Sequence, residues 1–170
     1  VRGVSDSLLA RILESLPSAS HPLSIALRND TDTHVVSGAP ADLASLVAAI
    51  ERAAAKDKAA HEAHERGGRP LSPVCEYLPV YAPFHSPMLA DALELVDEWA
   101  LQCGIDASLA HSLAAAVLTT PVDWPEQIRS ATASGAAWIV DMGPGATTVR
   151  MTRALVEGTG VGIVAAGTAA

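Results

Sequence analysis

The chain has 170 residues, 49% of them hydrophobic, which is enough to bury the core of one ordinary domain. Its formal net charge of −8 and the lack of a Lys/Arg-rich stripe argue against a nucleic-acid-binding protein. They do not exclude an anionic cofactor, because local groups hold such ligands. No apolar run reaches the length that spans a membrane.

The two cysteines, Cys75 and Cys103, do not have the spacing of metal ligands. We expect free thiols in a reducing, cytoplasmic compartment, with Cys103 in the apolar core. The sequence begins at Val1 and shows no signal peptide, so we expect a piece of a longer protein.

The first elements alternate between helix and strand. Ser5 or Asp6 is expected to cap a helix that Pro17 ends. Residues 23–27 and 34–36 are predicted to be strands separated by a turn. Asp42 is expected to open a long helix, whose polar continuation over 53–65 is predicted to be solvated or frayed.

The next segment is predicted to contain a third strand ending at Val80 and then a helix. Ser86 suits the N-cap position and Pro87 the first helical position. Apolar residues then recur at helical spacing as far as Cys103, and Gly104 ends the pattern. Two strands, a helix, a strand and a helix fit a small antiparallel sheet of ferredoxin-like kind with helices on one face.

The last third has the pattern of an α/β crossover. Residues 109–118 are predicted to be an apolar helix, 121–124 a turn or short edge segment, and Pro125 the start of a helix that ends at Gly135. Residues 137–140 read as a buried parallel strand. A glycine turn, another helix ended by Gly158 and Gly160, and a strand over 161–165 complete a right-handed crossover unit.

His85 is the strongest candidate for chemistry. It is expected at a strand-to-helix turn, beside the positive end of a helix, where the field disfavours the charged imidazolium. A neutral imidazole at a rigid junction is what a general base requires. A turn histidine with no chemical role is the alternative.

Four other features were weighed as sites. Gly143-Pro144-Gly145 could bind a phosphate, but a turn that shapes a wall is favoured, because a third glycine and an acidic partner are missing. His61, Glu62, His64 and Glu65 lack the zincin spacing and are expected on a solvated face, with no metal. Ser37 and Ser134 do not complete a Gly-x-Ser-x-Gly elbow. Asp141 either serves a site at a strand end or caps the turn at Gly143.

Several separated motifs resemble one family. They are, in chain order, Val35-Val36-Ser37-Gly38, Leu78-Pro79-Val80 with Pro83-Phe84-His85-Ser86, Pro121-Val122-Asp123-Trp124, and Ile139 to Gly145. This order is similar to the acyl carrier protein acyltransferases (malonyl/acetyl transferases). The stretch from Gly158 to Thr168 resembles the end of the acetyltransferase domain of type I fatty acid synthases of the fungal and actinobacterial kind.

The resemblance implies a fold class, a mechanism and partners. The fold is an α/β-hydrolase-like core with an inserted ferredoxin-like small subdomain. Residues 1–104 would be mainly that subdomain with the His85 segment, and 105–170 the C-terminal part of the core. His85 would be the catalytic histidine of a Ser/His ping-pong transfer of an acetyl starter group from acetyl-CoA to the acyl carrier protein.

The same resemblance implies that the nucleophile serine lies upstream of the small subdomain and therefore outside this chain. The isolated chain would be inactive and would expose apolar surface where the rest of the core docks. Acyl-CoA would be a substrate, with no tightly bound cofactor. The parent would be a homo-oligomeric multienzyme without nucleic-acid or membrane partners. Transfer of malonyl or palmitoyl groups, or a non-catalytic docking role, are the alternatives.

Overall fold

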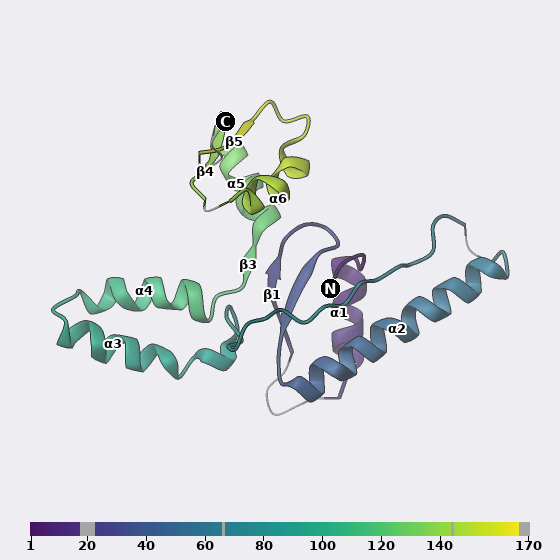
Figure 1. Ribbon diagram of the computed structural model, residues 1–170, viewed down its shortest axis with the longest axis horizontal. Helices are drawn as coiled ribbons and strands as arrows, with labels where there is room; N and C mark the ends of the chain where they lie inside the picture. Colours follow the sequence, from purple (N-terminus) through teal and green to yellow (C-terminus); the bar gives the residue numbers. More distant parts are fainter. Residues whose placement is uncertain (18–22, 66, 144, 167–170) are drawn as a thin grey trace. The chain divides into compact units, whose positions relative to one another are not determined.

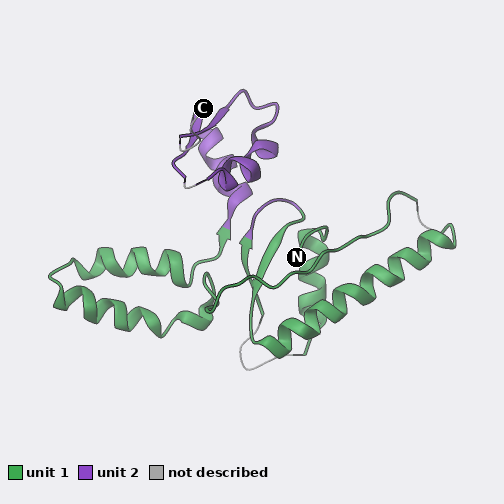
Figure 2. Cartoon of the chain, viewed as in Figure 1, with its two compact units in different colours: residues 1–27, 32–122 green, residues 28–31, 123–170 purple. Residues whose placement is uncertain are grey.

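The computed structural model describes residues 1–17, 23–65, 67–143 and 145–166. The chain divides into two compact units (Figure 2). Unit 1 comprises residues 1–27 and 32–122, and unit 2 comprises residues 28–31 and 123–170. In the described part of the chain, no helix is both long and apolar enough to cross a membrane. The mixed α/β class predicted from the sequence is confirmed.

Unit 1 is built on a three-stranded sheet and two helices (Figure 1). The strands are β1 (Ser24–Arg28), β2 (His34–Ser37) and β3 (Val122–Asp123), in the order β2-β1-β3. Helices α1 (Asp6–Ser15) and α2 (Pro40–Glu62) pack on each other. Their contact forms the hydrophobic core, which consists of Val4, Leu9, Ile12, Leu46 and Ile50.

Local signals set the start of both helices. The Ser5 side chain accepts a hydrogen bond from the backbone N–H of Leu8, which confirms Ser5 as the N-cap of α1. Pro40 occupies the first turn of α2, so this helix begins two residues earlier than Asp42. Of the two expectations for its second half, fraying was wrong, because α2 is continuous to Glu62, whereas solvation is confirmed, because residues 53–62 are exposed or half-buried. Asp57 stabilises this half by accepting a hydrogen bond from the Leu71 N–H at 2.8 Å.

The strand expected to end at Val80 does not form. Residues 75–80 are neither helix nor strand, and Val74 makes only an isolated bridge to Arg2. Tyr77, Leu78 and Val80 are all more than half exposed, so they lack the packing partners that stabilise a strand. Val122–Asp123, expected as a turn or short edge segment, takes the third place in the sheet beside β1.

A helical hairpin completes unit 1. A short 3-10 helix, η1 (Pro87–Leu89), precedes α3 (Ala92–Gln102), and α4 (Ala107–Leu118) packs along α3. The helix expected to start at Pro87 therefore begins as an α-helix only at Ala92. Gly104 adopts a φ of +69° in the turn, as its predicted role requires. Cys103 is exposed at the C-cap of α3 and is not a core residue, because the turn carries it past the helix interface.

Unit 2 contains the predicted strand–helix–strand crossover. Its elements are α5 (Trp124–Ala133), β4 (Trp138–Asp141), α6 (Thr147–Val156) and β5 (Gly162–Ala165). β4 and β5 pair in parallel, with Trp138 opposite Gly162 and Asp141 opposite Ala165. The expectation that β4 is buried was wrong: Trp138 and Val140 are 67% and 51% exposed while Asp141 is 9% exposed, so only one face of the strand is covered. Pro144, Gly167 and Thr168 lie outside the described residues.

The boundary between units 1 and 2 lies at Val122, and α4 belongs to unit 1. The predicted division at residue 104 separates a small subdomain from part of a larger acyltransferase core, and the two compact units of this chain do not test it. It stays a prediction.

Candidate active site

His85 lies in a strained turn held by the end of α4. Its backbone φ is +57°, in the left-handed region that non-glycine residues rarely occupy. The backbone N–H of His85 donates to the Val117 carbonyl at 3.3 Å, and that of Ser86 donates to the Leu118 carbonyl at 3.0 Å. A strained residue persists only where its surroundings fix it, and such residues cluster at functional sites.

The imidazole of His85 is oriented by a backbone carbonyl. Nδ1 lies 3.0 Å from the carbonyl oxygen of Thr120. Since a carbonyl oxygen can only accept, Nδ1 carries the proton and Nε2 is left with a free lone pair. The α-helix predicted directly behind His85 starts only at Ala92, and it is this hydrogen bond that decides which nitrogen of the neutral ring carries the proton. A partly exposed ring with a free Nε2 can accept a proton from a hydroxyl or thiol.

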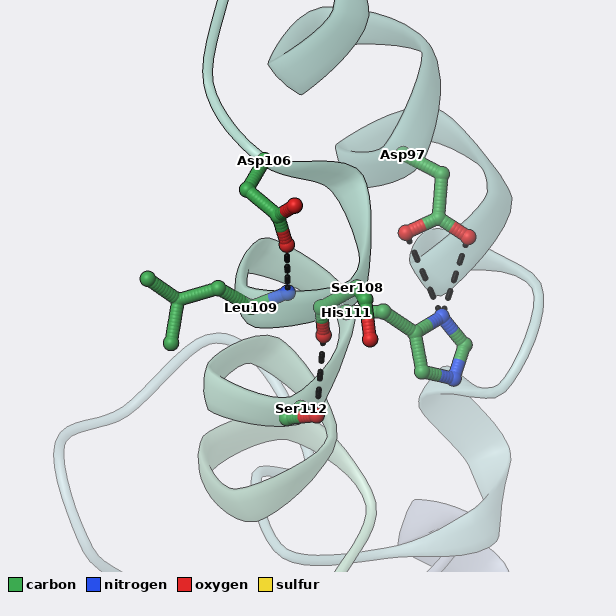
Figure 3. Close-up of polar contacts among 6 residues, drawn as sticks. All are labelled: Asp97, Asp106, Ser108, Leu109, His111 and Ser112. Atoms are coloured by element: carbon green, nitrogen blue, oxygen red, sulfur yellow. Dashed lines mark hydrogen bonds and ion pairs between the residues drawn. The ribbon is translucent and has the colours of Figure 1, made fainter.

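A second histidine contact, which no sequence pattern predicted, joins α3 to α4. Nδ1 of His111 donates to both carboxylate oxygens of Asp97, at 2.9 and 3.2 Å (Figure 3). Asp106 caps the same helix by accepting from the Leu109 N–H at 2.7 Å. These contacts fix α4, whose C-terminal carbonyls hold the His85 turn. The two residues lie 14 positions apart on different helices, so no periodic pattern relates them.

The two serines considered as nucleophiles have other roles. The Ser37 hydroxyl is 9% exposed and donates to the Phe84 carbonyl oxygen at 3.3 Å. Ser134 donates to the Ser130 carbonyl at 2.8 Å, inside α5 and its cap. Neither arrangement presents an activated hydroxyl to a base.

Asp141 caps the turn at Gly143, which was one of the two roles predicted for it. Its carboxylate accepts hydrogen bonds from the backbone N–H groups of Gly143, at 2.9 Å, and of Val149, at 3.2 Å. Asp141 is 9% exposed and both oxygens are used. It therefore fixes the turn between β4 and α6.

The histidines of α2 differ from the expected solvated face at one position. Nδ1 of His61 lies 2.8 Å from the Asp57 carbonyl oxygen and 3.3 Å from its carboxylate, and the His61 side chain is only 10% exposed. Among the described residues, no three His, Cys, Asp or Glu side chains gather as a metal site.

A comparison with known families finds a similarity in the first part of the chain. Residues 1–77 match the model of the fatty acid synthase central AT domain. This segment is therefore similar to a fatty acid synthase acyltransferase domain. The match to the central AT domain ends before His85, so it does not assign a role to this histidine.

Two curated relatives are similar to most of the chain. The fatty acid synthase beta subunit hexB of Dothistroma septosporum is 25% identical over 96% of this chain, and that of Gibberella zeae is 28% identical over 85%. The chain spans about a tenth of the length of these curated relatives, 10% and 8% respectively. The similarity to a fungal fatty acid synthase thus covers one small part of a large subunit.

Solved structures share the fold of this chain. The malonyl-transacylase in complex with a type II polyketide synthase acyl-carrier protein has a TM-score of 0.66 and 19% identity. The acyl-carrier-protein S-malonyltransferase of Burkholderia pseudomallei has a TM-score of 0.65 and 23% identity. In both cases 99% of this chain aligns with 54% of the solved chain. The chain therefore has about half of the transacylase fold.

Proposed function

We propose that this chain is part of a fatty acid synthase acyltransferase that moves an acetyl starter group from CoA to the acyl carrier protein. His85 is the general base, and the nucleophilic serine comes from polypeptide outside residues 1–170. The observation that carries the proposal is the 3.0 Å contact between Nδ1 of His85 and the Thr120 carbonyl, which leaves Nε2 free to accept a proton. The similarity to fatty acid synthase subunits and transacylases gives the reaction class.

The first half-reaction forms an acyl-serine. As the serine oxygen attacks the thioester carbonyl carbon of acetyl-CoA, Nε2 of His85 takes the serine proton. When the C–S bond breaks, Nε2 returns that proton to the departing CoA thiolate. The Thr120 carbonyl keeps Nδ1 protonated through the cycle, so Nε2 is the nitrogen that changes state.

The second half-reaction passes the acetyl group to the carrier. Nε2 takes the proton of the phosphopantetheine thiol, and the resulting thiolate attacks the acyl-serine carbonyl. The ester C–O bond breaks, and the serine oxygen recovers the proton from Nε2. The solved complex of a malonyl-transacylase with its acyl-carrier protein supports a carrier protein as partner.

A histidine replacement tests the base. In the complete enzyme that carries the nucleophile, we expect His85→Ala to lower acetyl loading from labelled acetyl-CoA by about 10²–10⁴-fold, the usual effect of losing a positioned base. His64→Ala is the matched control, because His64 is an exposed histidine with nearly the same φ, +59°. Near-normal acyl-enzyme formation by His85→Ala would refute the role.

A malonyl group is the second candidate substrate, because the similar solved structures are malonyl transferases. Loading assays with labelled malonyl-CoA and acetyl-CoA in parallel distinguish the two. The chain of residues 1–170 alone is expected to form no acyl adduct with either substrate, since its described serines lack an activating base. A covalent acyl-serine on the isolated chain would contradict the proposal that the nucleophile lies elsewhere.

The helical hairpin exposes apolar side chains. Leu109, Leu113 and Val117 follow one another at helical spacing on α4 and are each more than half exposed. Trp99 on α3 is 58% exposed. We propose that the remaining part of the acyltransferase core covers this surface. The complete synthase is proposed to be a homo-oligomer. A docking fragment without catalysis is the alternative, and the loading assay decides between them.

A further inference from the structure

The residues on both sides of His85 are held by serines from two neighbouring strands. Ser37, the last residue of β2, donates its hydroxyl to the Phe84 carbonyl oxygen at 3.3 Å. Ser24, the first residue of β1, donates to the Ser86 hydroxyl at 3.2 Å. Because β1 and β2 are adjacent in the sheet, the end of one strand and the start of the other act together on this turn.

Two of these three hydroxyls belong to buried residues, whereas Ser24 is half-buried. Ser86 is fully buried and Ser37 is 9% exposed. The Ser86 oxygen also accepts from the Met88 N–H at 3.3 Å, so it joins the His85 turn to the short helix that follows. A buried polar group left without its partner destabilises the structure more than an exposed one, so each contact constrains the turn strongly.

The turn requires such constraint because His85 has a φ of +57°. The carbonyls of Val117 and Leu118 hold its backbone N–H side. Without further contacts, the segment could relax towards negative φ and rotate the imidazole away from Thr120. The two serines supply the restraint on the opposite side, from the sheet.

We propose that Ser37 and Ser24 are positioning residues that hold the His85 ring against the Thr120 carbonyl. Neither serine is placed against the ring: Ser37 acts through the Phe84 carbonyl and Ser24 through the Ser86 hydroxyl. The value of this positioning for catalysis rests on the proposed function. The position and tautomer of the ring, however, can be measured without any acyl transfer.

The first experiment reads the ring directly. The 15N NMR shifts of the His85 imidazole are measured in the full chain and in its Ser37→Ala and Ser24→Ala variants. Ser45→Ala is the matched control, because it removes a hydroxyl that donates to the Ala41 carbonyl in α2. We expect a single Nδ1–H tautomer in the parent and the control, and a mixture of tautomers in the other two. Ser37→Thr keeps the hydroxyl in a β-strand and should restore the single tautomer.

Folding is checked by the dispersion of the backbone amide signals. If Ser37→Ala does not fold, Ser37→Cys replaces it, because a thiol has nearly the shape of the hydroxyl but is a weaker donor. A mixture of tautomers in the folded variant supports the inference. A single Nδ1–H tautomer that is unchanged in folded variants at both Ser37 and Ser24 overturns it.

The second experiment uses acetyl loading in the complete enzyme. Ser37→Ala is expected to lower kcat by about tenfold or more with little change in KM, since misplacement of a catalytic group affects the chemical step. Ser37→Thr should recover most of that loss. If His85→Ala retains loading, the proposed function fails. The NMR measurement still tests whether Ser37 and Ser24 position the ring, because it does not depend on acyl transfer.

Discussion

His64 and His85 share a left-handed backbone conformation, with φ of +59° and +57°. Among the described residues they are the only non-glycine positions with positive φ. His64 lies just past the C-cap of α2, where such a conformation commonly ends a helix. His85 has no such helical reason, and its conformation is imposed by contacts to β1, β2 and α4.

This difference predicts how the two sites respond to substitution. Asn tolerates the left-handed region and the β-branched Val does not, so His85→Val should be less stable than His85→Asn by about 1–3 kcal/mol. The imidazole is lost in both variants. The free energies of unfolding of His64→Val and His64→Asn should differ by less than about 1 kcal/mol, because an exposed helix end can rearrange. Urea unfolding measures both differences, and equal stabilities of the two His85 variants would contradict an imposed φ.

Two aspartates at the helix starts of the hairpin form a matched pair. Asp106 caps α4 through the Leu109 N–H, whereas Asp91, at the N-cap of α3, makes no capping hydrogen bond. Asp106→Ala should lower the free energy of unfolding by about 0.5–2 kcal/mol. Asp91→Ala should change it by less than about 0.5 kcal/mol. Urea titrations that gave the two variants the same loss would show that the capping bond contributes nothing.

Asp141 should matter for stability and not for proton transfer. Asp141→Ala leaves the N–H groups of Gly143 and Val149 without their acceptor, which should cost about 1–3 kcal/mol. Asp141→Asn keeps one acceptor oxygen and should lose less. Thermal unfolding of the variants tests this order. In the complete enzyme, a large fall in acyl loading by Asp141→Asn at full stability would show that the carboxylate has a chemical role.

Cys75 should make stability fall at alkaline pH. Burial raises the pKa of its thiol above 9.0, while the nearby N-terminal charge opposes this and Glu51 reinforces it. As the pH rises past 9.0, the unfolded thiol ionises while the folded thiol stays protonated, so the unfolded state gains stability. Cys75→Ala should therefore lose less stability than the parent between pH 9 and the folded pKa.

The control for this prediction is Cys103, an exposed thiol, replaced by Ala. Urea midpoints at a series of alkaline pH values give the comparison. Parallel curves for the parent and Cys75→Ala would show that burial does not hold this thiol in its neutral form.

Local signals predicted most helices and the glycine-rich turns. Ser5 starts α1, Gly104 and Gly135 end helices with positive φ, and β4 and β5 form the predicted parallel pair. The strand near Val80 was wrong because β-propensity reports the fit to a half-buried surface, and this segment has no such surface. The apolar run of β4 does form the predicted strand, but its apolar composition does not show that Trp138 and Val140 stay exposed on one face.

The sequence by itself determined that His85 sits at a turn before a helix, because Ser86, Pro87 and the apolar spacing are local features. Only the tertiary structure decided its strained φ, its Nδ1 partner Thr120 and the serines that hold it. These contacts join residues 35 to 62 positions apart. A single sequence does not encode such pairings in any periodic pattern, because they arise only when strands and helices pack into one unit.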